Sequence, residues 1–366
     1  MRGFVLTVAL LLGFSNGATA RPLDLKQVPA DAKWLLLVDI DAVRGAPDWN
    51  DGYQYFWRQM EPLFGLLRKG INFKDGLHGA SVYATVADAK HPEDFRGAAI
   101  ISVDLDRNHF VAALESFTGY KTATYGAHEI HTWQMPTDSD RDLTACLIFY
   151  DAKTIILAVT DEEARKAADV LDGKAPNITQ SDSALAVAIP NGTILLLRGL
   201  DLDKVAGKFE SPLLKQSESI SIAVGEEDEE IFAEVRLTLQ SAETAEQVQA
   251  LINGLRALVQ LQAGSQKAAA DLFGHLRCIC SGKVVNVSLR APTKELEKIF
   301  DDLGDVNIKV DASAKVEKKT PAEAKGKPSF DFKFGVQVDA GPDAEKKAKK
   351  SKEAEKPAEK RKSDDK

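Results

Sequence analysis

Two stretches of the chain share one pattern: WLLLVDID at residues 34–41 and ILLLRGLD at residues 194–201. Each starts with four large apolar residues, which is typical of a buried strand, and ends in an aspartate before a helical segment. A proline-containing segment precedes each of them, VPADA at residues 28–32 and IPNGT at residues 189–193. The recurrence after 160 residues predicts that the body of the chain is a duplicated unit.

The segments that follow repeat in the same order. SVYATV at residues 81–86 resembles SISIAV at residues 219–224, and KTIILAV at residues 153–159 resembles KVVNVSL at residues 283–289. Alternation of apolar and polar residues predicts strands with one buried and one wetter face. We therefore expect an α+β fold of two tandem related domains, each a mostly antiparallel sheet with helices packed on one face. Their predicted bounds are residues 21–175 and 176–308.

The first 20 residues have the features of a signal peptide. Arg2 supplies a positive charge, an apolar stretch too short to span a bilayer follows, and Ala18-Thr19-Ala20 forms a small-x-small cleavage site. We expect a mature chain from Arg21, exported to the periplasm or outside the cell, without a transmembrane segment.

Residues 309–366 differ from the body in composition. They are rich in Lys, Glu, Ala and Pro and carry a net charge of +5, so we expect a disordered tail. The segment 330–338 is an exception, because Phe330, Phe332 and Phe334 alternate as on a strand. This strand could extend the sheet of its own body or the sheet of a partner. The basic residues after it could meet the acidic body, an envelope protein or an anionic polymer.

Charge limits the function of the body, which carries a net charge of about −14 over residues 21–308. Nucleic-acid binding needs clustered Lys and Arg, so we do not expect it for the body.

An aromatic segment of the first half has no counterpart in the second. Trp49, Tyr53, Phe56 and Trp57 fall at helical spacing. They are either a stripe that faces the core or a surface for a partner or ligand.

The spacing of Asp39 and Asp41 resembles that of the nucleophile strand in haloacid-dehalogenase-type phosphatases. There, the first aspartate attacks phosphorus and the second is an acid/base, beside a bound magnesium. The same doublet recurs at residues 104–106 and 201–203. A short carboxylate at the start of a helix accepts hydrogen bonds from free backbone N–H groups, which accounts for all three copies. We interpret the doublets as structural and expect no catalytic, cofactor-binding or metal-binding residues.

Histidine and cysteine patterns indicate no site. His128 and His131 are three residues apart on a predicted strand, so their rings should point to opposite sides. Cys278 and Cys280 should share one face of a strand as small apolar residues. The sequence does not decide whether Cys146 forms a disulfide with one of them.

The VPxxA and LLLVDxD motifs and the tandem halves after a signal peptide resemble exported bacterial proteins of uncharacterised function, over about residues 25–303. The resemblance implies the architecture and no activity. We expect a non-enzymatic binding or scaffolding protein of the periplasm or cell envelope. The alternatives are a carrier of a small apolar ligand and a metal-dependent hydrolase that uses Asp39 and Asp41.

Overall fold

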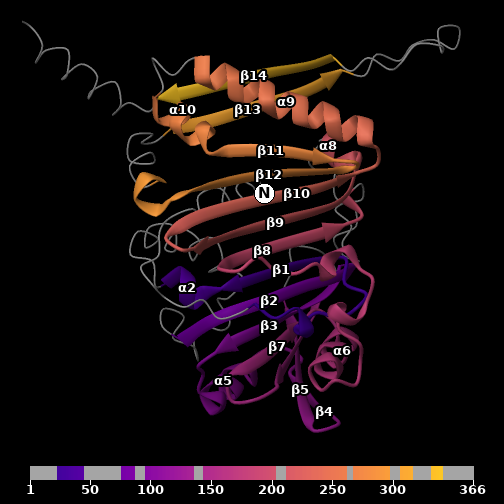
Figure 1. Cartoon of the computed structure of the whole chain (residues 1–366). Helices are drawn as coiled ribbons and strands as arrows, with labels where there is room; N and C mark the ends of the chain where they lie inside the picture. Colours follow the sequence, from indigo (N-terminus) through magenta and orange to yellow (C-terminus); the bar gives the residue numbers. More distant parts are fainter. Residues whose placement is uncertain are drawn as a thin grey trace, which may run out of the picture.

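The structure is a computed structural model, which describes residues 23–44, 76–86, 95–135, 143–202, 212–261, 267–296, 306–315 and 331–340. The predicted signal peptide, the aromatic segment around Trp49 and most of the tail lie outside the described residues. The rest is an α+β fold dominated by one large antiparallel sheet (Figure 1).

The first half contributes seven strands. After the 3-10 helix η1 (Leu25–Gln27), its elements are β1 (Trp34–Asp39), α2 (Ile40–Arg44), β2 (Leu77–Val86), β3 (Arg96–Val103), α5 (Arg107–Leu114), β4 (Lys121–Tyr125), β5 (His128–Met135), β6 (Leu143–Phe149), β7 (Thr154–Ala158) and α6 (Asp161–Leu171). Among the described elements, the hairpin β4–β5 has no counterpart in the second half.

The second half contributes five strands after the 3-10 turns η5 (Ile178–Gln180) and η6 (Ala184–Ala186). Its elements are β8 (Thr193–Leu200), α8 (Pro212–Lys215), β9 (Ser217–Glu227), β10 (Glu230–Leu239), α9 (Ala242–Leu261), α10 (Lys267–Gly274), β11 (Leu276–Ser281) and β12 (Val284–Pro292). Among the described helices, α9 is the longest at 20 residues, and none has both the length and the apolarity needed to cross a membrane.

The strands of both halves lie in a single sheet. Its order is β11-β12-β10-β9-β8-β1-β2-β3-β7-β6-β5-β4, and β1 pairs antiparallel with β8, with Leu36 opposite Leu197. Figure 1 shows the strands of the two halves continuing one another across this pair. The sequence predicted one sheet for each half. The structure corrects this, because the repeated strands pair with each other instead of closing two separate sheets.

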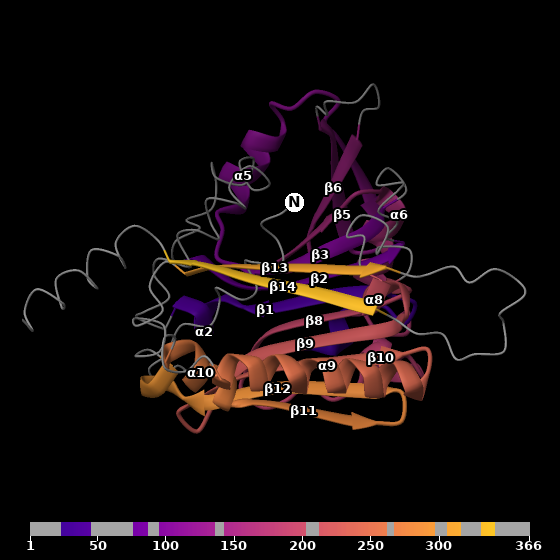
Figure 2. The same cartoon turned by 90° about the horizontal axis from the view of Figure 1, so that it is seen from above.

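Helices cover both faces of the sheet, whereas the sequence predicted helices on one face. Leu35, Leu37 and Tyr83 point to the face that packs against α6 and the 3-10 turns, which we call the α6 face. Val38 and Val103 belong to the cluster under α2 and α5, on the α5 face. Figure 2 shows α5 and α6 on opposite sides of β3, β5 and β6. Strands such as β3 are therefore buried on both sides, which explains the apolar run AAIISV at residues 98–103.

Helix α9 packs over β10, β11 and β12 on the α5 face, as successive cross-strand pairs show. Cys280 lies opposite Val285, Val285 opposite Leu237, Leu237 opposite Ile220, and Ile220 opposite Gly199. Because directly opposed residues point to the same face, this row leads to Trp34, the partner of Gly199. Cys278 and Cys280 both face α9, and they and Cys146 are free thiols.

Arg198 fixes the segment between the halves to β8. Its buried guanidinium donates hydrogen bonds to the carbonyls of Leu185 (2.7 Å) and Ala188 (3.0 Å) and to the hydroxyl of Ser221 (3.2 Å). Burial, together with a smaller effect of the nearby Arg236, lowers the pKa of Arg198 to about 10. The segment between the halves is irregular, and Arg198 supplies hydrogen bonds to its backbone carbonyls. Buried backbone carbonyls require such hydrogen bonds.

Two strands of the tail are described, β13 (Val306–Lys315) and β14 (Asp331–Ala340). Strand β14 coincides with the strand predicted at residues 330–338. It pairs with β13 in a separate two-stranded sheet, and not with an edge of the main sheet as the first of the two interpretations expected. The register places the positions of Phe332 and Phe334 opposite Ala314 and Ala312, whereas Phe330 lies outside the described residues.

The junction of β8 and β9 depends on a close approach of two backbones. A Cβ atom at Gly225 would lie 2.1 Å from the carbonyl oxygen of Gly192 and 2.7 Å from the ring of Phe232. Since a backbone carbonyl cannot move aside as a flexible side chain can, this position requires glycine.

We expect Gly225→Ala to lower the free energy of unfolding by about 1–3 kcal/mol, the usual cost of overpacking. Gly254, in α9, is the matched control, because nothing lies within 4 Å of a Cβ built there. Gly254→Ala should raise the free energy of unfolding by about 0.5–1 kcal/mol through helix propensity. Urea denaturation followed by circular dichroism measures both. An unchanged midpoint for Gly225→Ala would contradict the packing described.

Candidate functional site

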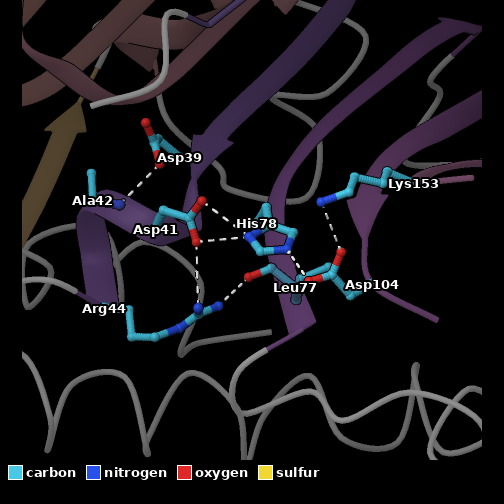
Figure 3. A network of polar contacts seen from close by, with 8 residues as sticks. All are labelled: Asp39, Asp41, Ala42, Arg44, Leu77, His78, Asp104 and Lys153. Carbon is cyan, nitrogen blue, oxygen red and sulfur yellow. Dashed lines mark hydrogen bonds and ion pairs between the residues drawn. The ribbon is translucent and has the colours of Figure 1, made fainter. Parts of the chain in front are cut away.

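Polar residues gather where β1, β2, β3 and β7 come together at one end of the sheet. The register sets Asp39 of β1 opposite Gly79 of β2, and Ser102 of β3 opposite Thr154 of β7. The turns that leave or enter these strands bring Asp41, His78, Asp104 and Lys153 together (Figure 3). This cluster is the candidate functional site.

His78 bridges two carboxylates. Its Nδ1 lies 3.0 Å from Oδ1 of Asp41, and its Nε2 lies 2.9 Å from Oδ2 of Asp104 (Figure 3). Both contacts can be hydrogen bonds at once only when the ring carries a proton on each nitrogen. The ring then joins α2 to the segment after β3 through β2. With both nitrogens engaged, His78 is not placed to accept a proton from a nucleophile.

Cations complete the network on either side of His78. Lys153 Nζ lies 3.3 Å from Oδ1 of Asp104, and the guanidinium of Arg44 lies 3.3 Å from Oδ1 of Asp41. Arg44 also donates to the carbonyl oxygen of Leu77. The hydrogen bond from His78 lowers the pKa of Asp104 most, followed by that from Lys153.

Two of the aspartates begin helices. The Oδ1 of Asp39 accepts a hydrogen bond from the backbone N–H of Ala42 (2.9 Å) at the start of α2. Asp106 likewise accepts from the N–H groups of Asn108 and His109 at the start of α5. Each doublet at these two strand ends therefore combines a capping aspartate with an aspartate that binds His78. In the third doublet, Asp201 lies 4.0 Å from Lys33 with φ of 53°, and residue 203 lies outside the described residues.

A small cavity of about 170 Å³ adjoins this network. We call it the Asp39 cavity, after the buried carboxylate in its wall, which is 2% exposed. Ser81 donates a hydrogen bond to Gln27 within the same wall (2.7 Å). Its lining residues are Leu23, Asp24, Gln27, Val38, Asp39, His78, Gly79, Ala80, Ser81, Ile100, Ser102 and Thr154. Among the described residues, the lining contains two carboxylates and no Lys or Arg.

The arrangement differs from that of the phosphatase considered for Asp39 and Asp41. That fold has a parallel sheet, whereas β1 lies between two antiparallel neighbours. Asp41 lies in the first turn of α2 and points to His78, so Asp39 and Asp41 do not lie on one side of a strand. Within the described ranges, no three His, Cys, Asp or Glu side chains are grouped so that they could hold a metal ion.

His128 and His131 lie on β5 and contact different partners. The ring of His128 stacks on Tyr150 and lies 3.2 Å from the carboxylate of Asp172 after α6. His131 is buried, and its Nδ1 lies 2.9 Å from the hydroxyl of Tyr120. Burial lowers the pKa of His131. The two rings do not converge on one site.

A second titratable cluster, under α6, was not apparent from the sequence. Glu163, in the first turn of α6, is 5% exposed, and its Oε1 accepts a hydrogen bond from Thr85 (3.2 Å). Its Oε2 and the hydroxyl of Tyr83 are buried without a hydrogen-bond partner among the described residues. Burial raises the pKa of both groups, and the charge of Glu163 raises that of Tyr83 further. Only a contact across 78 residues places Glu163 under the sheet, so no local motif could have revealed it.

The structure does not place the aromatic surface residues that the sequence proposed. Trp49, Tyr53, Phe56 and Trp57 lie outside the described residues. His78 is the central residue that sequence reasoning missed, because its contacts to Asp41 and Asp104 span 37 and 26 residues and leave no local pattern. The recurrence of Asp doublets after paired strands was the available signal.

No protein-family model and no curated protein matches the chain. Solved structures with some similarity include three crystal forms of TP0453. Form III aligns with a TM-score of 0.44 at 10% identity, over 77% of this chain and 98% of that one. Form IV aligns with a TM-score of 0.44 at 9% identity and form I with 0.42 at 10%, each over 76% of this chain and 96% of the other. A similarity of this extent assigns no function.

We expect His78→Gln to raise the pKa of Asp104 toward the ordinary aspartate value, because the largest lowering effect on it is removed. The ionised Asp104 contributes stability above its unfolded-state pKa, and this contribution is lost as the pH falls through the lowered folded-state pKa. Because the folded-state pKa is higher in the variant, the variant should lose this contribution at a higher pH. NMR titration of the side-chain carboxyl carbon measures this pKa. His275→Gln, which removes an exposed contact to Glu295 elsewhere, should leave it unchanged.

Glu163→Gln should stabilise the protein increasingly as the pH rises above the ordinary range of glutamate. Because the folded-state pKa of Glu163 is raised, this group contributes stability below its unfolded-state pKa. That contribution is lost as the pH rises through the folded-state pKa. Gln keeps an acceptor for Thr85 and does not ionise. Thermal melts from pH 4 to pH 8 should show a widening gap from the native protein. The exposed neighbour Glu162 is the control, and Glu162→Gln should give no such trend.

Proposed function

We propose that the chain is an exported protein with a non-enzymatic binding or scaffolding role in the periplasm or cell envelope, built from two related halves. The sequence supports export through the signal-peptide pattern of residues 1–20. The sheet supports duplication. From the central pair outward, the orders β1-β2-β3-β7-β6 and β8-β9-β10-β12-β11 set the strands that resemble one another in sequence at equal places.

The observation that carries a binding role is a wide apolar surface in the middle of the α5 face. Leu36, Leu197, Ile222 and Val235 are directly opposed on four neighbouring strands, and all four are half-buried. With Trp34 and Ile220, which are also half-buried, we call this set the central apolar face. Large apolar areas that stay partly open typically mark interaction sites.

The described helices meet this surface at its two sides. Helix α2 contacts β2 and β8, and α9 contacts β10, β11 and β12. The α6 side of the same strands is already covered: Leu35, Leu37 and Phe232 are buried in its core. The two faces therefore differ in burial, and an apolar partner would bind the α5 face, where the apolar side chains stay partly open.

The polar residues support a structural role more than a catalytic one. Asp39 and Asp106 bind helix N–H groups, and Asp41 and Asp104 bind His78, Arg44 and Lys153. Each of these carboxylates has a folding role that needs no substrate. A hydrolase that uses Asp39 and Asp41 would have to give up contacts that hold α2 in place.

A carrier of a small apolar ligand is the second candidate, and the same surface favours it. The central apolar face lies on one face of the sheet, between α2 and α9. A lipid chain or another apolar molecule could be held there. The two candidates differ in occupant: a carrier retains a small molecule, whereas a scaffold retains a protein partner.

Ile222→Lys and Ser219→Lys form a matched pair for the test. The residues are three positions apart on β9, both are half-buried, and they point to opposite faces. We expect Ile222→Lys to weaken binding at least about tenfold, because a charge would be placed in an apolar interface, whereas Ser219→Lys should retain binding. Circular dichroism establishes that both variants are folded.

The occupant is identified from the native chain. Native mass spectrometry finds a retained small molecule if the protein is a carrier. Capture from envelope extract, with and without residues 309–366, finds a protein partner and tests whether the tail contributes. Binding of neither kind, or equal loss in both lysine variants, would contradict the proposal.

A further inference from the structure

We propose that the hairpin of β13 and β14 covers the central apolar face of its own chain, and that a partner or ligand reaches this face by displacing the hairpin. The covering part rests on the chemistry of the two surfaces. The displacement part also rests on the proposed function, because it concerns the occupant of the same face.

One face of this hairpin is apolar at every position. Residues two apart on a strand share a face, as do directly opposed residues of an antiparallel pair. The register therefore divides the two ten-residue strands into two sets. The apolar set consists of Val306, Ile308, Val310, Ala312, Ala314, Phe332, Phe334, Val336, Val338 and Ala340. The other set is polar apart from Gly335 and consists of Asn307, Lys309, Asp311, Ser313, Lys315, Asp331, Lys333, Gly335, Gln337 and Asp339. A division of this kind is typical of a ribbon with one face buried and the other in water.

Such a hairpin needs an apolar surface to cover. Two strands form a single layer, which cannot bury its own apolar face, and an isolated hairpin is only marginally stable in water. Among the described strands, β13 and β14 pair only with each other, so no third strand extends their sheet. The surface that stabilises the hairpin must therefore be contacted face to face.

The α5 face of the main sheet offers a matching surface. The row through Leu36 and Leu197 continues on both sides, because Val82 lies opposite Leu36 and Val287 lies opposite Val235. These residues are all half-buried. From β1 to β10 there are three strand spacings of about 4.8 Å each, or about 14 Å. Two strands fit across this width, and sheets packed face to face bury both inner faces.

The connection to the main sheet permits this contact. Residues 297–305 separate β13 from Leu296, which is buried and follows β12 closely. A segment of this length reaches at most about 36 Å. Figure 1 and Figure 2 both place the hairpin on the side of the sheet that carries α9, with its strands running roughly along β8 and β9. Docking therefore keeps every strand pair and changes only the position of the hairpin over the sheet.

The short connection also sets how strongly a partner must bind. A segment on a short linker reaches an effective concentration of about millimolar at its site. A partner or ligand has to exceed this competition, so the hairpin raises the affinity needed to occupy the central apolar face. Covering the face also protects the free protein, because an open apolar surface of this kind is an aggregation liability.

Cross-linking tests the contact directly. In a chain whose three cysteines are replaced by alanine, Ile222→Cys is combined with Val336→Cys. A bismaleimide that reaches about 10 Å, the usual separation of packed sheets, is then added. We expect one chain linked to itself as the main product, identified by peptide mass spectrometry. The matched control combines Val336→Cys with Ser219→Cys, on the same strand but on the opposite face of the sheet. Equal yields in the two pairs, or links only between two chains, would overturn the proposal.

A second measurement keeps the native cysteines. Val336→Asp places a charge in the apolar set, and Gln337→Asp places one in the polar set. Val336→Asp should raise the fluorescence of added anilinonaphthalene sulfonate (ANS), a probe of open apolar surface, by at least about twofold. Gln337→Asp should match the native chain. If the hairpin covers nothing, its own apolar face is already open. Val336→Asp would then lower the signal or leave it unchanged, and that result would overturn the proposal.

Displacement is measured with the same probe. Saturating ANS should lower the yield of the cross-link between positions 222 and 336, and an unchanged yield would overturn the displacement part. The proposed function fails separately, if neither native mass spectrometry nor capture from envelope extract finds an occupant for the native chain or for Val336→Asp. An occupant that binds both chains equally, without the cross-link, leaves the proposed function in place and overturns the cover.

Discussion

The pairing of β1 with β8 is the constraint on which the rest of the structure depends. Each of these strands opens one half of the body, and their antiparallel ladder from Trp34–Gly199 to Val38–Leu195 joins the halves into one sheet. Gly199 leaves room for the indole of Trp34, since a Cβ there would lie 2.2 Å from its ring. Without this pair, two edge strands rich in leucine would be open to solvent and to other chains.

The same central pair explains how the polar end of the sheet is built. Because β1 lies between β8 and β2, its last residue, Asp39, is enclosed by structure on both sides. The chain then turns at once into α2, where Asp41 reaches His78 on β2. The carboxylates, the histidine and the cations Arg44 and Lys153 hold three successive strand ends together. We interpret this network as a set of contacts that fixes the strand ends relative to one another, beside a small cavity lined by two carboxylates.

The two faces of the sheet differ in how well they are covered, and this difference supports a binding role. Under α6, small residues such as Ala164, Ala167 and Ala168 let the helix approach closely, and that face is well packed. Across β1, β8, β9 and β10, the opposite face is apolar and half-buried. A surface of that kind gains free energy when an apolar partner covers it.

Much of the local structure could be predicted from the sequence. The repeated segments predicted the strands that became β2, β7, β9 and β12, and alternation predicted the strand β14 of the tail. The capping role of the doublets could also be read locally, because an N-cap involves residues only two or three positions apart. His128 and His131 were correctly expected to diverge, since strand alternation is a local property.

The sequence by itself determined the repeated strands of the two halves and the caps of two helices, because hydrophobic periodicity and capping act over a few residues. Only the tertiary structure decided that both halves share one sheet, that helices cover both faces, and that His78 joins Asp41 to Asp104. These features depend on contacts between residues far apart in the chain. Nothing in the local pattern of β1 specifies that its free edge is filled by β8 and not by a strand of its own half.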